Sequence, residues 1–509
     1  MGKVDYKKRP LEQLLIVAEI QEFLKNLEQE PNLSYNNLSR KILSQILEIV
    51  QDFLGTELYV RSGHQIDFQE ISEATRRLIN SLFNKKIINA LNKAARLYHD
   101  EPYFIRYSAE LCDTVLLSDA GKNVGRITGG SDLEPEKALM KAIGEGVERH
   151  CLGIYQKKNF VVSSYDEIKD QAINPVFFAT ISPIQKEKPE FLRWQFDKKS
   201  IFQWDKCFSL PNKKPIFIPA QLIYVPYKYF LQEPIIQLPL STGAAAGHSL
   251  EEALYRGICE VVERDAFMIT YLNKLSPPII DITSSQDDRI KEITAAYKRY
   301  NLEHYALDIT TDIELPTAMI LIIDRTGIGP AVTVATKTSV NILEAIIGAT
   351  YEAQKTRVWI RDVMKKGDYN LKNIKSMADK ISDFIDRGLF WSSTEMIKHI
   401  EFLFQGSKKI LEGDSSVPTL DYQANYQKVI TLFVKKDIPV YAKDLTTPEI
   451  NSLNFKVVKV IIPQLQPLYL WEQFRYLGSN RLYQAPISMG HLQAPLSMEK
   501  LNNVPHPFL

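Results

Sequence analysis

A helix pattern that occurs twice is the feature of this sequence that most limits how the chain can fold. Residues 137–149 read KALMKAIGEGVER, and residues 251–264 read EEALYRGICEVVER. At an offset of 115 residues, the apolar, acidic and basic positions of the two stretches coincide. The matched pairs are Ala138/Ala253, Leu139/Leu254, Ile143/Ile258, Glu145/Glu260, Val147/Val262, Glu148/Glu263 and Arg149/Arg264. The pattern predicts two amphipathic helices of the same kind, each with an apolar face for the core.

The polar faces of these two helices indicate a site. Residues three and four apart share a helix face, so each copy gathers two glutamates and an arginine on one side. One such helix is usually a solvated face with an internal salt bridge. Four carboxylates facing one another, however, would repel unless cations lay between them. Magnesium prefers oxygen ligands and is often shared with nucleotide phosphates, for which arginine has suitably forked donors. A carboxylate-bridged redox metal is the competing interpretation, but no Glu-x-x-His pair accompanies either helix.

A third, weaker copy follows at residues 343–357, LEAIIGATYEAQKTR. At an offset of 92 from the second copy, Glu344, Ala345 and Glu352 fall on Glu252, Ala253 and Glu260. Lys355 stands where the second glutamate would be, and Arg357 is displaced by one position. The loops GRITGGSDLEP and STGAAAGHSLEE lead into the first two copies, and their small residues suit helix capping and close approach of backbone N–H groups to phosphate.

The rest of the chain predicts an α+β protein. Residues 8–98 show helical periodicity in three segments, 11–30, 38–54 and 76–98, which predicts a helical N-terminal region over 1–100 for scaffolding or docking. Residues 101–509 are expected to form the catalytic domain, with β-rich runs at 215–227, 317–327, 331–336 and 456–465. Helices are expected near 136–155, 250–273, 342–362 and 390–404, and the charged region 363–415 is interpreted as a solvated helical insertion.

Composition excludes several classes of function. The formal net charge is +1, so neither a nucleic acid nor an anionic membrane is expected as partner. The four cysteines form no C-x-x-C pair, which argues against a zinc site or a redox dithiol. No stretch approaches the ~20 apolar residues that span a bilayer, and no signal segment opens the chain, so we expect a cytoplasmic protein.

Several segments resemble the YcaO family. GEGVERH resembles its first signature helix, STGAAAGHSLEEALYRGICEVVERDAF its second, and YEAQKTRVWIRD its third. The segments IFIPAQLIYVPY and VYAKDLTTPEI agree as well, so the resemblance covers about residues 105–509. It implies the YcaO-type ATP-binding fold, an α+β fold in which repeated helices pack against β-sheet, with ATP and Mg2+ as cofactors.

The resemblance also implies roles for individual residues. It makes Glu145, Glu148, Glu260 and Glu263 magnesium ligands, and it makes Arg149, Arg264 and Arg357 phosphate contacts. Lys141, His248, Glu252 and Gln354 would complete the nucleotide site. Two of these depart from the family pattern: Lys141 replaces a serine, and His248 replaces a frequent asparagine.

The activity implied is ATP-dependent activation of a peptide-backbone amide. In the azoline-forming branch, Cys, Ser or Thr of a ribosomally synthesised peptide becomes a thiazoline or oxazoline. The tail NNVPHPFL resembles the Pro-rich tail of that branch, which implies active-site roles for His506 and Leu509. Expected partners are a precursor peptide, a separate leader-binding protein related to ubiquitin-activating proteins, and a second copy of the chain. Thioamide formation with a sulfur donor and a non-catalytic scaffold are the alternatives.

Overall fold

The computed structural model describes residues 71–96, 98–122, 125–178, 180–230, 232–366, 381–411 and 421–509, together with residues 39, 42 and 378. The first two predicted N-terminal helices, 11–30 and 38–54, lie outside these stretches apart from residues 39 and 42. Helices and sheets mix along the chain, which confirms the predicted α+β class. Within the described residues, no helix has the length and apolar character needed to cross a membrane.

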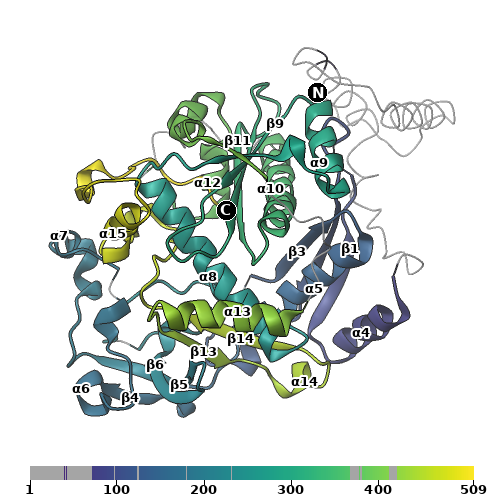
Figure 1. Ribbon diagram of the computed structural model, residues 1–509. Helices are drawn as coiled ribbons and strands as arrows, with labels where there is room; N and C mark the ends of the chain where they lie inside the picture. Colours follow the sequence, from purple (N-terminus) through teal and green to yellow (C-terminus); the bar gives the residue numbers. More distant parts are fainter. Residues whose placement is uncertain are drawn as a thin grey trace, which may run out of the picture.

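Three separate sheets form the framework (Figure 1). The first is antiparallel and contains β1 (Ile88–Lys93), β2 (Ile105–Leu111) and β3 (Ile127–Asp132), in that order. The second has the order β4 (Val161–Ser164), β5 (Ile201–Leu210), β13 (Val440–Asp444), β14 (Lys456–Ile461) and β7 (Ala244–Gly247), with β6 (Lys214–Pro219) paired to β5. The third has the order β11 (Val332–Thr338), β10 (Thr317–Ile323), β9 (Glu303–Asp308), β8 (Ile279–Asp281) and β12 (Lys408–Ile410).

Each copy of the repeated helix follows an edge strand of a different sheet. The helices are α5 (Pro135–Leu152) after β3, α8 (Leu250–Leu272) after β7 and α10 (Ile342–Lys365) after β11. Each helix packs on its own sheet and also reaches the next one: α5 contacts β7 and β14, α8 contacts β11, and α10 contacts β3. The three strand–helix units are therefore arranged in a closed cycle, with the three helices gathered around its centre.

Shorter helices pack around these three strand–helix units. They are α4 (Glu73–Asn84), α6 (Tyr165–Ile168), α7 (Pro183–Lys186), α9 (Asp288–Arg299), α12 (Phe384–Phe390), α13 (Tyr422–Lys435), α14 (Pro448–Asn451) and α15 (Asn480–Ser488). Amphipathic α13 lies along α8, and α15 also packs on α8 (Figure 1). The second half of α8, from Asp265 to Leu272, is buried all round, as expected of a helix at the centre of a core.

Two predicted elements are wrong in part. The third N-terminal helix was expected over 76–98, but α4 ends at Asn84 and residues 88–93 form strand β1, paired with β2. The prediction of a solvated insertion over 363–415 fails for residues 384–404, because α12 and the 3-10 segment Thr394–Phe404 are packed into the core. The division at residue 100 stays a prediction, although β1 joins the same sheet as β2 and β3.

Candidate functional site

The first two signature helices present their acidic faces through the same set of contacts. Glu145 Oε2 accepts a hydrogen bond from the Gly129 backbone N–H at 3.0 Å, and Glu260 Oε2 accepts one from the Gly243 N–H at 3.1 Å. One turn further along each helix an arginine pairs with that glutamate: Arg149 with Glu145, and Arg264 with Glu260. In both helices, therefore, the first glutamate of the signature is held by a backbone N–H of the segment before the helix and by an arginine one turn later.

The second glutamate of each signature, Glu148 or Glu263, is buried near other carboxylates. Burial, and then the charges of Glu260 and Glu145, hold the pKa of Glu148 well above its usual range. Burial likewise raises the pKa of Glu263. One oxygen of Glu263 accepts from Arg264 at 2.7 Å and from Thr336 at 3.1 Å, whereas the other oxygen, Oε2, is buried with no hydrogen-bond partner among the described residues.

These carboxylates suit magnesium in their chemistry. They supply only oxygen donors, and a divalent cation between them would offset both the burial and the neighbouring charges that raise the pKa of Glu148. The free oxygen of Glu263 is an open coordination position of the right kind. Across the described residues, no three acidic, histidine or cysteine side chains converge closely enough to form a preassembled metal site. Arg149 and Arg264 each take one oxygen of Glu145 and Glu260 in this arrangement, so a metal would compete with an arginine at these carboxylates.

Comparison with known proteins identifies the family. The family model described as YcaO cyclodehydratase, ATP- and Mg2+-binding, matches residues 129–466, which include all three signature helices. The chain belongs to the YcaO family. It thus carries an ATP- and Mg2+-binding domain, and the cofactors implied by the sequence are confirmed at this level.

Individual relatives are more distant. An uncharacterized protein of Methanothermobacter thermautotrophicus is 26% identical over 164 residues, which is 32% of this chain and 42% of that protein. A solved heterocyclase in complex with substrate and cofactor has a TM-score of 0.67 at 19% identity and covers 85% of this chain. YcaO from Methanopyrus kandleri, bound with AMPPCP and Mg2+, has a TM-score of 0.53 at 14% identity, covering 77% of this chain and 90% of its own. This chain spans 57% of the length of the heterocyclase chain. At identities of 19% and 14%, the two structures establish the shared fold.

Two lysines that the sequence analysis did not assign to the site lie beside these carboxylates. Lys459 of β14 is buried and donates to the carbonyls of Leu240 and Thr242, both at 2.6 Å. Burial lowers its pKa to about 8, against the opposing charges of Glu260 and Glu148. Lys459 therefore ties the loop before β7 to β14 and places a positive charge beside the acidic pair.

Lys355 of α10 is the second such lysine. Its ammonium pairs with Glu352 at 2.5 Å, and the charges of Glu352 and Glu145 raise its pKa against the effect of burial. The sequence held a signal for this residue, because the offset of 92 places Lys355 in register with Glu263. The third signature helix of this YcaO protein thus presents a cation where the first two present a carboxylate.

Three of the residues expected at the nucleotide site lie near the starts of α5 and α8. Lys141 is on the second turn of α5, donates to Asp132 at 2.8 Å and lies over the ring of Tyr351. Glu252 is buried, accepts from the backbone N–H of His248 at 2.8 Å and pairs with Arg256. The His248 ring packs against the Phe455 ring in a tilted arrangement, with centroids 4.5 Å apart. Each of the three is within a local network that holds a loop to a helix.

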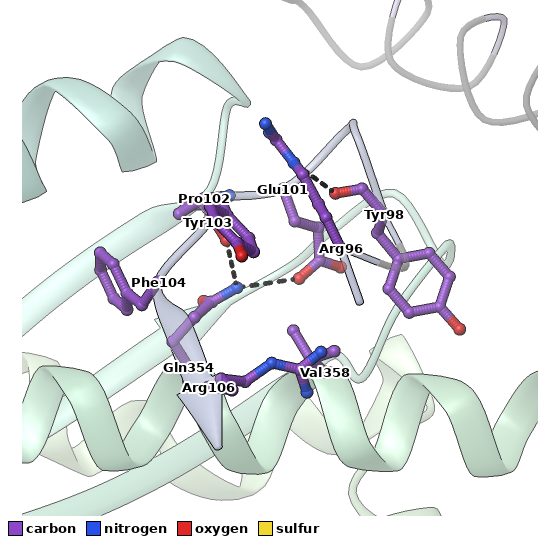
Figure 2. Close-up of a pocket in the computed structure, with 9 residues that line it drawn as sticks. All are labelled: Arg96, Tyr98, Glu101, Pro102, Tyr103, Phe104, Arg106, Gln354 and Val358. Atoms are coloured by element: carbon purple, nitrogen blue, oxygen red, sulfur yellow. Dashed lines mark hydrogen bonds between the residues drawn. The ribbon is translucent and has the colours of Figure 1, made fainter. Parts of the chain in front are cut away.

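Gln354 and Arg357 lie elsewhere. The Gln354 amide donates to Glu101 at 3.2 Å and to the Pro102 carbonyl at 3.0 Å, at a small pocket between the segment before β2 and α10 (Figure 2). Arg357 is fully buried, with ion pairs to Glu101 at 3.0 Å and to Asp324 at 2.5 Å. The structure does not bring these two side chains together with the four signature glutamates.

The C-terminal tail is an anchored part of the structure. Asn502 N–H donates to the Leu272 carbonyl at 2.7 Å, Trp391 Nε1 donates to the Pro505 carbonyl at 3.0 Å, and buried Arg387 donates to the His506 carbonyl at 2.9 Å. The tail therefore runs along the second half of α8 and ends near the centre of the molecule (Figure 1).

The end of the tail meets the acidic site through Phe508. The Arg264 guanidinium lies over the Phe508 ring, 4.3 Å from its centroid. His506 itself is fully buried, with its Nε2 2.7 Å from the Tyr469 carbonyl oxygen, and burial beside Arg387 holds its pKa well below its usual range. The imidazole is thus neutral and packed between aromatic rings, while Leu509 is half-buried next to α12.

Proposed function

We propose that this protein activates peptide-backbone amides with ATP and Mg2+, and that its reaction is cyclodehydration of Cys, Ser or Thr to thiazoline or oxazoline in a ribosomally synthesised peptide. The observation that carries the proposal is the pair of matched Glu-x-x-Glu-Arg faces on α5 and α8, within a chain of the YcaO family. Bound ATP would supply the phosphoryl group that makes the amide oxygen a good leaving group.

The chain's own residues would act by binding and orientation. Glu145, Glu148, Glu260 and Glu263 would hold the metal, since their mutual repulsion favours a cation between them. Arg149 and Arg264, released from Glu145 and Glu260 when the metal takes those carboxylates, would turn their guanidinium groups to phosphate oxygens. Lys141, His248 and Glu252 would fix the loops that surround the nucleotide, and Gln354 and Arg357 would support α10 from its buried side.

The tail favours the azoline-forming branch over thioamide formation. Phe508 stacks on an arginine that pairs with two signature glutamates, so the tail end adjoins the proposed site of chemistry. We assign catalytic roles to Leu509 and His506 of this anchored tail, and the burial of His506 would also keep the tail in place. The proposed partners are the precursor peptide, a leader-binding protein related to ubiquitin-activating proteins, and a second copy of this chain.

The experiment is a mass measurement. Purified protein is incubated with MgATP and the Cys/Ser/Thr-rich peptide and partner protein encoded beside it, and peptide mass and released phosphate are followed. A loss of about 18 Da per ATP consumed supports cyclodehydration, whereas a gain of about 16 Da with sulfide present would assign the thioamide reaction instead. Glu148→Gln and Glu263→Gln should abolish turnover, while Glu190→Gln on the exposed 3-10 segment Pro189–Trp194 should not.

If the folded protein binds no ATP, the catalytic proposal fails and the alternative of a non-catalytic scaffold remains. The four retained glutamates argue against a scaffold, because crowded carboxylates that raise one another's pKa are costly without a metal.

A further inference from the structure

The three strand–helix units, β3–α5, β7–α8 and β11–α10, each carry a basic side chain where strand and helix meet, but not on the same element. In the first unit, Gly130 of β3 lies against Lys141 of α5, since a Cβ at Gly130 would come within 2.7 Å of the Lys141 Cβ. The second unit has the same arrangement in register, with Ala245 on the strand and Arg256 on the helix. In both units the strand residue is small and the helix residue, 11 positions later, is the cation.

The third unit reverses this arrangement. Its strand residue is Lys337 of β11, and the residue 11 positions later is Gly348 of α10. A Cβ at Gly348 would stand 3.2 Å from the Lys337 Cγ, so the lysine stem occupies the space that a helix side chain fills in the other units. The cation has moved from helix to strand, and the missing side chain at Gly348 leaves the room for it.

Lys337 also differs from its two counterparts in its partners. Lys141 pairs with Asp132, and Arg256 pairs with Glu252. Lys337 is exposed, and among the described residues no ion pair includes it; Glu263 and Glu352 pair instead with Arg264 and Lys355.

Lys337 nonetheless lies beside the signature helices. Its stem packs at Gly348 of α10, and the preceding strand residue, Thr336, donates to Glu263 of α8 at 3.1 Å. Its charge also acts on Glu352 of α10 and on Lys141 of α5.

We infer that Lys337 contacts the polyphosphate of the bound nucleotide, at the end farthest from the base. This assignment rests on the proposed function, because it takes the signature helices to be the nucleotide site. A lysine ammonium is a strong point donor for phosphate oxygens, and the free Lys337 head requires no exchange of partners before it binds. Lys355, which faces the same centre from α10, provides a second cation on that side of the site.

The test compares nucleotides that differ only in phosphate number. Binding of a non-hydrolysable ATP analogue, ADP and AMP is measured by calorimetry with Mg2+ for the wild type, Lys337→Gln, Lys337→Arg and the control Lys428→Gln, an exposed lysine of α13. Lys337→Gln should weaken the triphosphate about tenfold and leave AMP unchanged, whereas Lys337→Arg should retain most of the affinity.

The exchange between strand and helix gives a second test. Lys337→Gly should lose the triphosphate affinity, and adding Gly348→Lys in the same chain should restore part of it, as in the first unit. Triphosphate affinity within twofold of wild type in Lys337→Gln, or equal losses for AMP and triphosphate, would overturn the assignment alone. A wild type that binds none of the nucleotides would overturn the proposed function and the assignment with it.

Discussion

Arg357 offers a direct test of what a signature arginine does in this chain. The resemblance assigns it to phosphate, but in the structure it is fully buried and donates to Glu101, to Asp324 and, at 2.7 Å, to the Pro330 carbonyl. Arg357→Met removes a cation from two buried carboxylates; Glu101 keeps its ion pair with Arg361 at 2.6 Å, so the main loss falls on Asp324. Breaking a buried ion pair from one side costs about 3–5 kcal/mol, since the remaining charge is left uncompensated.

The expected change in melting temperature follows from chain length. An unfolding entropy of about 2.1 cal/mol/K per residue gives about 1.1 kcal/mol/K for a chain of 509 residues. A loss of about 4 kcal/mol therefore lowers the melting temperature by about 4 °C. The control is Arg325→Met, which breaks a half-exposed pair with Glu303 and should cost at most about 1 kcal/mol.

The assay combines thermal unfolding with nucleotide titration well below the melting temperature. Arg357→Met should melt earlier than wild type yet bind a non-hydrolysable ATP analogue with unchanged affinity. A variant that melts like wild type but has lost nucleotide affinity would refute the structural role and return Arg357 to the phosphate site.

Three further predictions concern the tail, the core and the loop before β7. Phe508→Ala should weaken binding of the ATP analogue about fivefold in calorimetry, because a cation–π contact with Arg264 contributes about 1 kcal/mol, while Phe508→Trp should retain it. Burial lowers the pKa of His304 to about 3, so the unfolded chain takes up its proton first as pH falls and stability is lost from about pH 6.5 downward. His304→Phe should therefore lose about 2–3 kcal/mol less than wild type between pH 7 and pH 4.5 in urea unfolding. Lys459→Met frees the carbonyls of Leu240 and Thr242, so hydrogen exchange at Gly243 and neighbouring amides should accelerate by about tenfold or more.

The long signature helices were predictable because their periodicity is strong. The stretches expected near 136–155, 250–273 and 342–362 correspond to α5, α8 and α10, with ends within a few residues. Each combines an apolar stripe with good helix formers over at least four turns, and in such segments packing and local preference agree. The mutual placement of the Glu-x-x-Glu-Arg faces followed from the repeat itself.

Strand β1 was not predictable in the same way. Its sequence, INALNK, continues an apolar spacing that began in α4, and leucine, alanine and lysine favour helix when nothing else decides. Pairing with β2, the next strand of the chain, overrides that preference. The buried Arg387 is similar, since its partners Glu472 and the His506 carbonyl are 85 and 119 residues distant.

The sequence also could not predict which side of α10 faces the site. This helix is buried on both sides, so amphipathicity does not say which polar residues see the centre. Gln354 and Arg357 find partners in Glu101 and Asp324, and Lys355 points the other way to Glu352. The family signature therefore identifies α10 as a helix of the site, but packing determines which of its polar residues faces the signature glutamates.

The change of sign in the third unit has an electrostatic reason. Three identical helices around one centre would place six glutamates together, and each added carboxylate would raise the cost of ionising its neighbours. Burial, and then the charges of Glu260 and Glu145, already raise the pKa of Glu148. Placing Lys355 on the helix and Lys337 on the strand divides the centre into an acidic side, suited to magnesium, and a basic side, suited to phosphate. A magnesium–nucleotide complex presents the complementary charges, with its metal and its phosphate oxygens a few ångströms apart. On this argument the departure of the third unit from the repeat is what allows a cyclic arrangement of similar parts to bind a ligand of two charges.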